Sequence, residues 1–142
     1  MNENNIHDST SSHSPFSDQI PDLLGEHLDH LKASAISTEV IKEREYTSVL
    51  GKKRLADVGF SRAQQRAPGI LIPLYGVDGS TIGYQYRPDN PRFNTKGKPI
   101  KYETPPGQNN RLDCHPLCRH HLDNPGVPLW VTEGVKKADS LV

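Results

Sequence analysis

The 142-residue sequence has few of the side chains that build a large core or a disulfide framework. It has two cysteines, one methionine, one tryptophan and a hydrophobic content of only 33%. No apolar run approaches the ~20 residues that a membrane-spanning helix needs, and the amino terminus lacks the basic and apolar regions of a signal peptide. We therefore expect a cytoplasmic protein with a modest core. Its twelve prolines and eleven glycines predict many turns.

The formal net charge is zero, but the charges are unevenly distributed along the chain. Residues 1–50 hold nine acids and three bases, whereas residues 51–119 hold twelve Lys and Arg against five Asp and Glu. A basic segment of this kind is typical of proteins that bind a polyanion. Solvated surface charge gives the same pattern, so the excess alone does not decide between the two.

The first half of the chain predicts a disordered tail followed by short helices. Residues 1–18 are rich in Asn, Ser, His and Asp and bury too little to become ordered. Residues 19–68 predict a small helical subdomain, which packs its own helices, docks a partner or binds DNA. Its elements are a helix over residues 20–31, a helix over 38–43 capped by Ser37, a helix holding Val49, Leu50 and Leu55, and a capping box formed by Ser61 and Gln64.

Residues 69–126 predict a β-hairpin that runs into a long loop. A strand over residues 70–75 is followed by the turn pair Asp78-Gly79 and by a return strand in which Tyr84 and Tyr86 share the core face. Pro73 cannot donate a ladder hydrogen bond, so we expect an edge or a bulge there. From residue 88 the alternating pattern is lost, and residues 88–126 are predicted to be mainly loop.

Residues 127–142 predict a strand, a turn and a helix. Residues 129–131 form an apolar run typical of a buried strand, and Gly134 permits a turn. The helix that follows should bury Val135 and leave Asp139 on its solvent side. Glu133 would then lie at the carboxyl end of a strand, where it could hold a cation or move a proton. A glutamate that merely favours the helix dipole gives the same pattern.

The motif Val131-Thr132-Glu133-Gly134, followed by Ala138 and Asp139, resembles the opening motif of a TOPRIM domain. Residues 72–84 resemble the β-hairpin of the amino-terminal subdomain of bacterial-type primases, and residues 99–105 resemble the loop after it. The similarity spans roughly residues 28–142 and is closest to primase-like TOPRIM proteins of plasmids, phages and mobile elements. It implies an α+β fold in which the helical subdomain and the hairpin lead into an incomplete α/β TOPRIM domain at residues 127–142.

The resemblance implies that Glu133 is the catalytic residue and a ligand of Mg²⁺. A TOPRIM domain carries an Asp-x-Asp pair some tens of residues after this glutamate, and the sequence ends at Val142 before reaching it. We therefore expect an amino-terminal part of a primase-like protein that is inactive alone. Its implied partners are single-stranded DNA and either a replicative helicase or the remainder of the domain. The alternative is a non-catalytic DNA- or protein-binding module.

Two further sets of residues bear on binding. In the resembled primases, basic residues of the hairpin and loop guide the single-stranded template, and their motif positions correspond here to Arg87 and Lys101. Lys96 and Lys98 are candidates by proximity alone. A second set, within residues 114–121, contains Cys and His side chains of the kinds that bind zinc. Because these ligands crowd into eight residues, we expect an exposed loop without zinc.

Overall fold

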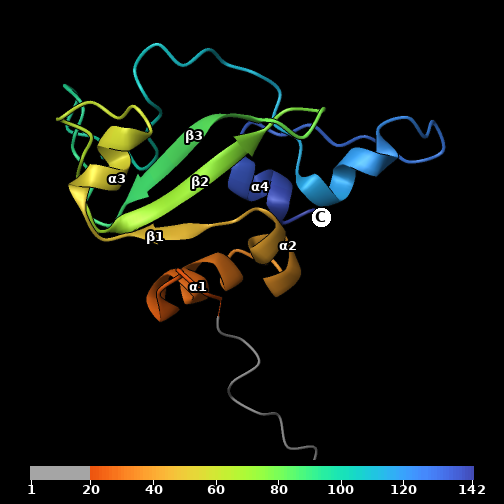
Figure 1. The fold of residues 1–142 in the computed structure, drawn as a ribbon, viewed down its shortest axis with the longest axis horizontal. Coiled ribbons are helices and arrows are strands. Elements are labelled where there is room, and N and C mark those ends of the chain that lie inside the picture. The colour runs from red at the N-terminus through yellow and green to blue at the C-terminus, as the bar shows by residue number, and fades with distance from the viewer. Residues whose placement is uncertain (1–19) are drawn as a thin grey trace, which may run out of the picture.

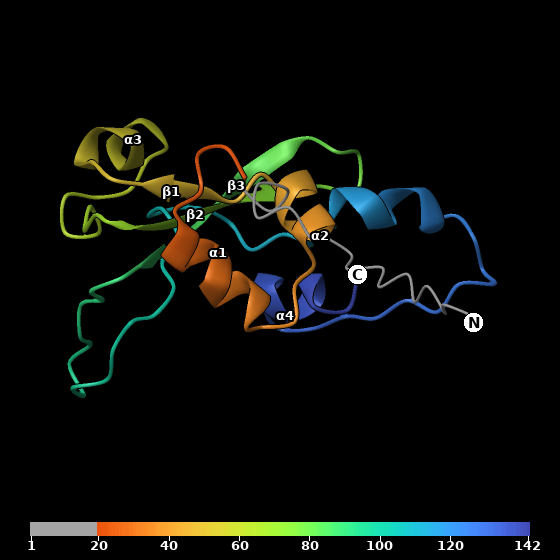
Figure 2. The ribbon, with the colours of Figure 1, turned by 90° about the horizontal axis from the view of Figure 1, so that it is seen from below.

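The computed structural model describes residues 20–142, and the tail predicted over residues 1–18 lies outside the described residues. The described part is an α+β fold with a three-stranded antiparallel sheet and short helices on both of its faces (Figures 1 and 2). Within this range, no helix has the length and apolar character needed to cross a bilayer. The elements are, in chain order, α1 (Gly25–Lys32), α2 (Thr38–Glu43), β1 (Thr47–Val49), α3 (Lys52–Asp57), β2 (Gly69–Tyr75), β3 (Thr81–Pro88), the 3₁₀ helix η1 (Pro116–His121) and α4 (Val135–Asp139).

The central strand of the sheet, β2, is buried on both of its faces. Ile70 and Ile72 pack in one core with α1, α2 and Val135 of α4. Leu71 points to the other face and packs in a second core that includes Leu55 of α3. Because successive side chains of a strand alternate between faces, an unbroken apolar run is what a strand covered on both sides requires.

The predicted hairpin is confirmed. Gly79 has a φ of 83°, a left-handed conformation that glycine adopts without strain. The Asp78 carboxylate accepts the backbone N–H of Ser80 at 3.0 Å and closes the turn. Tyr86 of the return strand is fully buried, and Tyr84 packs half-buried against the same core, as the alternating pattern predicts.

The sheet tolerates Pro73 in its central strand for a local reason. Pro73 lies opposite Tyr84, whose backbone N–H points away from β2 and donates to the Gln108 side chain at 2.9 Å. The missing N–H of Pro73 would therefore face the β1 side. There β1 has already ended, since Thr47 is paired with Leu71. A register shift between residues 74 and 75 follows immediately, so the predicted bulge lies one residue further along.

Of the three helices predicted within residues 19–68, α2 is confirmed and the other two need correction. Ser37 caps α2, because its hydroxyl accepts the N–H of Val40 at 3.2 Å. The first helix begins at Gly25 instead of residue 20, because Asp22 has a φ of 65° that no α-helix accommodates. The third helix begins at Lys52, so it holds Leu55 but neither Leu50 nor Val49, which pairs with Gly69 at the end of β2.

The strand predicted over residues 129–131 is wrong. Their side chains are 71–76% exposed, and the described sheet has no fourth strand. A strand needs a partner about 4.8 Å away, and the outer sheet edges are already used. Tyr86 of β3 exchanges backbone hydrogen bonds with Glu103, and on the other edge Ser48 of β1 donates its N–H to the Asp22 carbonyl. The apolar run therefore stays in solvent, and only the helix of the predicted strand–turn–helix unit forms.

Candidate nucleic-acid interface

Four basic side chains from four separate segments lie close together on the sheet face that carries α1 and α4. They are His30 of α1, Arg87 of β3, Lys101 of the following loop and Lys136 of α4, and we call them the basic cluster. The Lys136 amine lies 3.3 Å from Nε2 of His30. Figure 2 shows α1 and α4 side by side beneath the sheet, so residues more than a hundred positions apart in sequence meet here.

Strand pairing places Arg87 and Lys101 in this cluster. Arg87 lies directly opposite Ile70, and residues opposite each other in an antiparallel pair point to the same face. Arg87 therefore points toward the face on which α1 and α4 pack. The chain then returns along β3, because Tyr86 and Glu103 exchange two backbone hydrogen bonds of 2.8 and 2.9 Å. This pairing brings Lys101 alongside the end of β3.

The members of the basic cluster perturb one another electrostatically. Burial lowers the pKa of Lys136, and the charges of Arg87 and Lys101 lower it further. Burial also lowers the pKa of His30, with Arg87 and Lys136 as the next causes and Asp89 acting in the opposite direction. Like charges held this close make a region of positive potential, and a bound anion relieves their repulsion.

The acidic residues around the basic cluster neutralise only part of its positive charge. Asp89 lies 3.9 Å from the Arg87 guanidinium, but it also binds His27 at 3.1 Å. Within residues 20–142, no carboxylate forms an ion pair with Lys101 or Lys136. The two lysines are therefore the members most available to an external anion.

Lys96 and Lys98 lie apart from the basic cluster, in an exposed turn. A bridge between Phe93 and Pro99 closes this turn, and the Asn94 side chain accepts the backbone N–H groups of both lysines at 2.9 Å. Phe93 is 65% exposed beside them. In the described structure, no contact joins the side chain of either lysine to the cluster, so their nucleic-acid role rests on charge alone.

Glu133, predicted as catalytic and metal-binding, lies in the segment before α4 with its side chain 77% exposed. It pairs with Lys137 one helical turn later, and the hydrogen bond from Lys137 lowers the pKa of its carboxyl group. Among the described residues, it belongs to no group of three or more potential metal ligands. Its roles in catalysis and Mg²⁺ binding remain predictions.

A buried ion network fixes α4, and it corrects the predicted exposure of Asp139. Asp139 is 1% exposed because Arg44, itself fully buried, donates to its two oxygens at 3.1 and 2.5 Å. The Tyr46 hydroxyl donates to the same carboxylate at 2.7 Å, and Arg44 also binds Asp113 at 2.6 Å. The network holds α4 against the core and so positions Lys136.

The Cys and His residues of the 114–121 segment serve the fold in part. His115 has both ring nitrogens engaged, with Nε2 donating to the Val40 carbonyl at 3.0 Å and Nδ1 accepting the Leu117 N–H at 3.1 Å. Burial raises the pKa of the Cys114 and Cys118 thiols, which disfavours their thiolate forms. The expectation of an exposed loop is therefore wrong for Cys114 and His115, which are 9% and 4% exposed, and the expectation that the segment binds no zinc stays a prediction.

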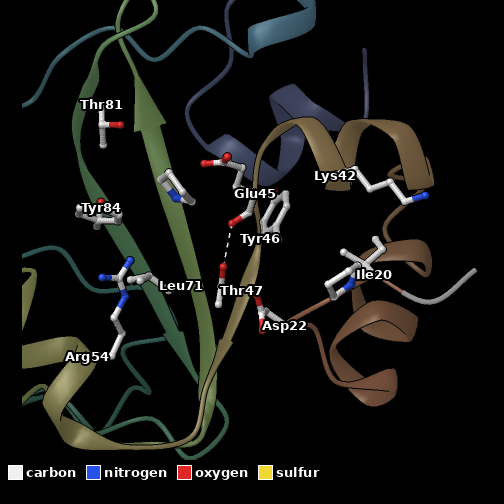
Figure 3. Close-up of a pocket in the computed structure, with 12 residues that line it drawn as sticks. Ile20, Asp22, Lys42, Glu45, Tyr46, Thr47, Arg54, Leu71, Thr81 and Tyr84 are labelled. Carbon is white, nitrogen blue, oxygen red and sulfur yellow. Dashed lines mark hydrogen bonds between the residues drawn. The ribbon is translucent and has the colours of Figure 1, made fainter.

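A groove runs along the β1 edge of the sheet, with Arg54 and Tyr84 on one side and Ile20 and Asp22 on the other (Figure 3). Leu71 and Tyr84 are among its lining residues, as are Thr47 and Glu45, and the Thr47 hydroxyl donates to the Glu45 carbonyl at 3.0 Å. Its lining contains two cations and two anions, namely Lys42, Arg54, Asp22 and Glu45. Because these charges balance, the groove is a weaker candidate for an anionic ligand than the basic cluster.

Comparison of the chain with protein-family models, with curated proteins and with solved structures finds no match.

Proposed function

We propose that this chain binds single-stranded nucleic acid through the basic cluster, as part of a primase-like TOPRIM protein that serves DNA replication of a mobile element. The observation that carries the proposal is the convergence of Arg87, Lys101, Lys136 and His30 from four segments onto one face. Folding brings the charges of Arg87, Lys101 and Lys136 together against their repulsion. A polyanion compensates that cost, because phosphates neutralise the cluster and release their own counterions.

Two features favour a single strand over a duplex. Exposed Phe93 lies beside Lys96 and Lys98, and an aromatic face flanked by cations can stack on an unpaired base while the cations hold the backbone. In the described part of the chain, no helix longer than eight residues projects from the fold to enter a major groove. The template-guiding role that the primase resemblance implies for Arg87 and Lys101 agrees with both features.

The proposal assigns binding, and not catalysis, to the chain itself. Mg²⁺ keeps most of its waters unless several oxygen ligands converge on it, and Glu133 is a single exposed carboxylate paired with Lys137. Nucleotidyl transfer assisted by Glu133 and Mg²⁺ is proposed only for a complete TOPRIM domain, in which further carboxylates would join it.

Fluorescence anisotropy with a labelled oligonucleotide at low salt tests the binding. We expect Lys101→Ala with Lys136→Ala to weaken binding about tenfold or more, since each lost phosphate contact is worth on the order of 1 kcal/mol. The matched control is Lys52→Ala with Lys53→Ala, which removes the same charge from exposed positions of α3. Equal weakening by both pairs would show that binding is diffuse, and no effect of the first pair would refute the assignment.

A second candidate function, protein binding, rests on the exposed apolar side chains of residues 129–131. A replicative helicase is the class of partner that the primase resemblance implies. Light scattering of a mixture with such a helicase should detect a complex that Leu129→Ser with Val131→Ser abolishes. Because both side chains are exposed, the double variant should fold normally, and an unchanged complex would exclude this segment as the contact.

A further inference from the structure

Beside the basic cluster, a group of three side chains has the composition and geometry of a transition-metal site. Glu26 and His27 come from the first turn of α1, and Asp89 follows β3. One ligand atom from each of the three lies within 4.8 Å of the others. We propose that Glu26, His27 and Asp89 bind a divalent transition metal, with Zn²⁺ as the best fit. This inference does not depend on the proposed nucleic-acid function.

The distances between His27 and Asp89 already suit such an ion, and the exposed Glu26 side chain would approach it from within 4.8 Å. Nε2 of His27 lies 3.1 Å from each Asp89 oxygen. A tetrahedral zinc ion with bonds of about 2.1 Å holds its ligand atoms roughly 3.4 Å apart, so the imidazole and the carboxylate need to separate by only a few tenths of an ångström. Imidazole favours Zn²⁺ over Mg²⁺ or Ca²⁺, which prefer oxygen ligands alone.

The surroundings orient the ligands. His27 is 3% exposed, and its Nδ1 lies 2.6 Å from the hydroxyl of Ser48 on β1. The same hydroxyl oxygen accepts the Leu24 N–H at 2.8 Å, which ties the start of α1 to the sheet. The backbone N–H of Asp89 donates to the Pro68 carbonyl at 3.0 Å. A ring nitrogen bonded to a fixed partner is the arrangement that orients metal-binding histidines in general.

The hydrogen bonds of the His27 ring are compatible with both the metal-free and the metal-bound form of the site. In the neutral tautomer with its proton on Nε2, the ring would accept the Ser48 hydroxyl at Nδ1 and donate to Asp89 from Nε2. With metal on Nε2, the ring proton resides on Nδ1 and is donated to the Ser48 oxygen, which has two lone pairs and so can also keep the Leu24 N–H. A neutral His27 ring therefore needs only to exchange one tautomer for the other when metal binds at Nε2.

The charges around the site also favour one dication. Glu26 and Asp89 are exposed carboxylates and His27 contributes a neutral donor, so Zn²⁺ balances the three ligands. Arg87 lies 3.9 Å from Asp89, and His30 and Lys136 are the other basic groups nearby. The charges of Arg87 and Lys136 limit the affinity for a cation, while the contact with Arg87 also holds the Asp89 carboxylate in place. With only three protein ligands, the metal keeps a position for water or another ligand.

Titration of the full chain with Co²⁺ and Zn²⁺ tests the site, with visible absorption for cobalt and calorimetry for zinc. We expect one metal per chain, with affinity reduced at least about tenfold by Asp89→Asn, Glu26→Gln or the ring-orienting change Ser48→Ala. Asp29→Asn, on the same helix and also exposed, is the matched control and should bind normally. Nitrogen-resolved NMR of the His27 ring should show the change of tautomer when zinc is added.

The same experiment separates this site from the cysteine segment. Cobalt held by Cys114 or Cys118 would give a near-ultraviolet thiolate-to-metal absorption band, and Cys118→Ser would remove it. Absence of stoichiometric binding, binding that survives Glu26→Gln with Asp89→Asn, or a cobalt spectrum carried only by thiolate would each overturn the proposal. Because the Glu26 and Asp89 side chains are exposed, their variants should retain the fold, which circular dichroism checks.

Discussion

Removing the carboxylate of Asp139 should destabilise the protein far more than removing any exposed charge. Asp139→Ala leaves the fully buried Arg44 without its main counter-charge and the Tyr46 hydroxyl without its acceptor. Breaking a buried ion pair by deleting one partner costs about 3–5 kcal/mol. Asp113 still contacts Arg44 at 2.6 Å, which places the expected loss near the lower end of that range.

Urea unfolding followed by circular dichroism measures this loss. For a small domain whose total stability is about 5–15 kcal/mol and whose m-value is roughly 1.5–2 kcal/mol per molar, the midpoint should fall by about 2 M. Glu133→Gln is the control within the same segment, and it should leave the midpoint unchanged because that carboxylate is exposed.

A double variant decides between loss of an interaction and loss of packing. Arg44→Met with Asp139→Leu removes both charges and fills the space with apolar groups, so it should recover much of the stability that Asp139→Ala loses. A loss below about 1 kcal/mol for Asp139→Ala would refute the claim that this network anchors α4. A double variant as unstable as the single variants would show that packing, and not charge, is responsible.

Three further expectations follow from individual residues. Purified chain should synthesise no primer and cleave no DNA, and Glu133→Ala should change nothing; activity lost in that variant would contradict the account. Trp130, the sole tryptophan and 76% exposed, should emit as a hydrated indole and be quenched freely by iodide, whereas a blue-shifted emission would show that the segment is buried. Burial lowers the pKa of His115 from 6.5, so its neutral form stabilises the fold above that pH and the contribution is lost as the pH falls through the lower folded value. Unfolding measured across this range should show less pH dependence in His115→Gln, and an unaltered profile would contradict the assignment.

The parts of the fold that local chemistry determines could be predicted from the sequence. The Asp78-Gly79 turn depends on neighbours within two residues, and the Ser37 cap depends on a donor three residues away. The hairpin could be predicted because its alternating apolar pattern is that of a pleated strand. In each case the interacting groups are close in the chain, so the pattern and the structure report the same contact.

The rest depends on contacts that no local pattern encodes. Asp139 looked like a solvent-facing helix residue, and its burial depends on Arg44, 95 positions away. Residues 129–131 have strand propensity, but a strand forms only where a partner edge is free, and both outer edges of the sheet were already in use. The motif resemblance predicts a role for Arg87 and Lys101. No pattern near Lys136 predicts one for that residue, because its place in the basic cluster depends on where α4 packs.

The salt dependence of single-stranded DNA binding tests the central claim most directly, because it counts phosphate contacts. On single strands, log K against log salt has a slope of about −0.7 per contact, so contacts by Arg87, Lys101 and Lys136 predict a slope near −2. Lys101→Ala with Lys136→Ala should make the slope shallower by about 1.4, while Lys52→Ala with Lys53→Ala should leave it unchanged. A slope that ignores the first pair, or that changes equally with the second, would contradict binding through the basic cluster.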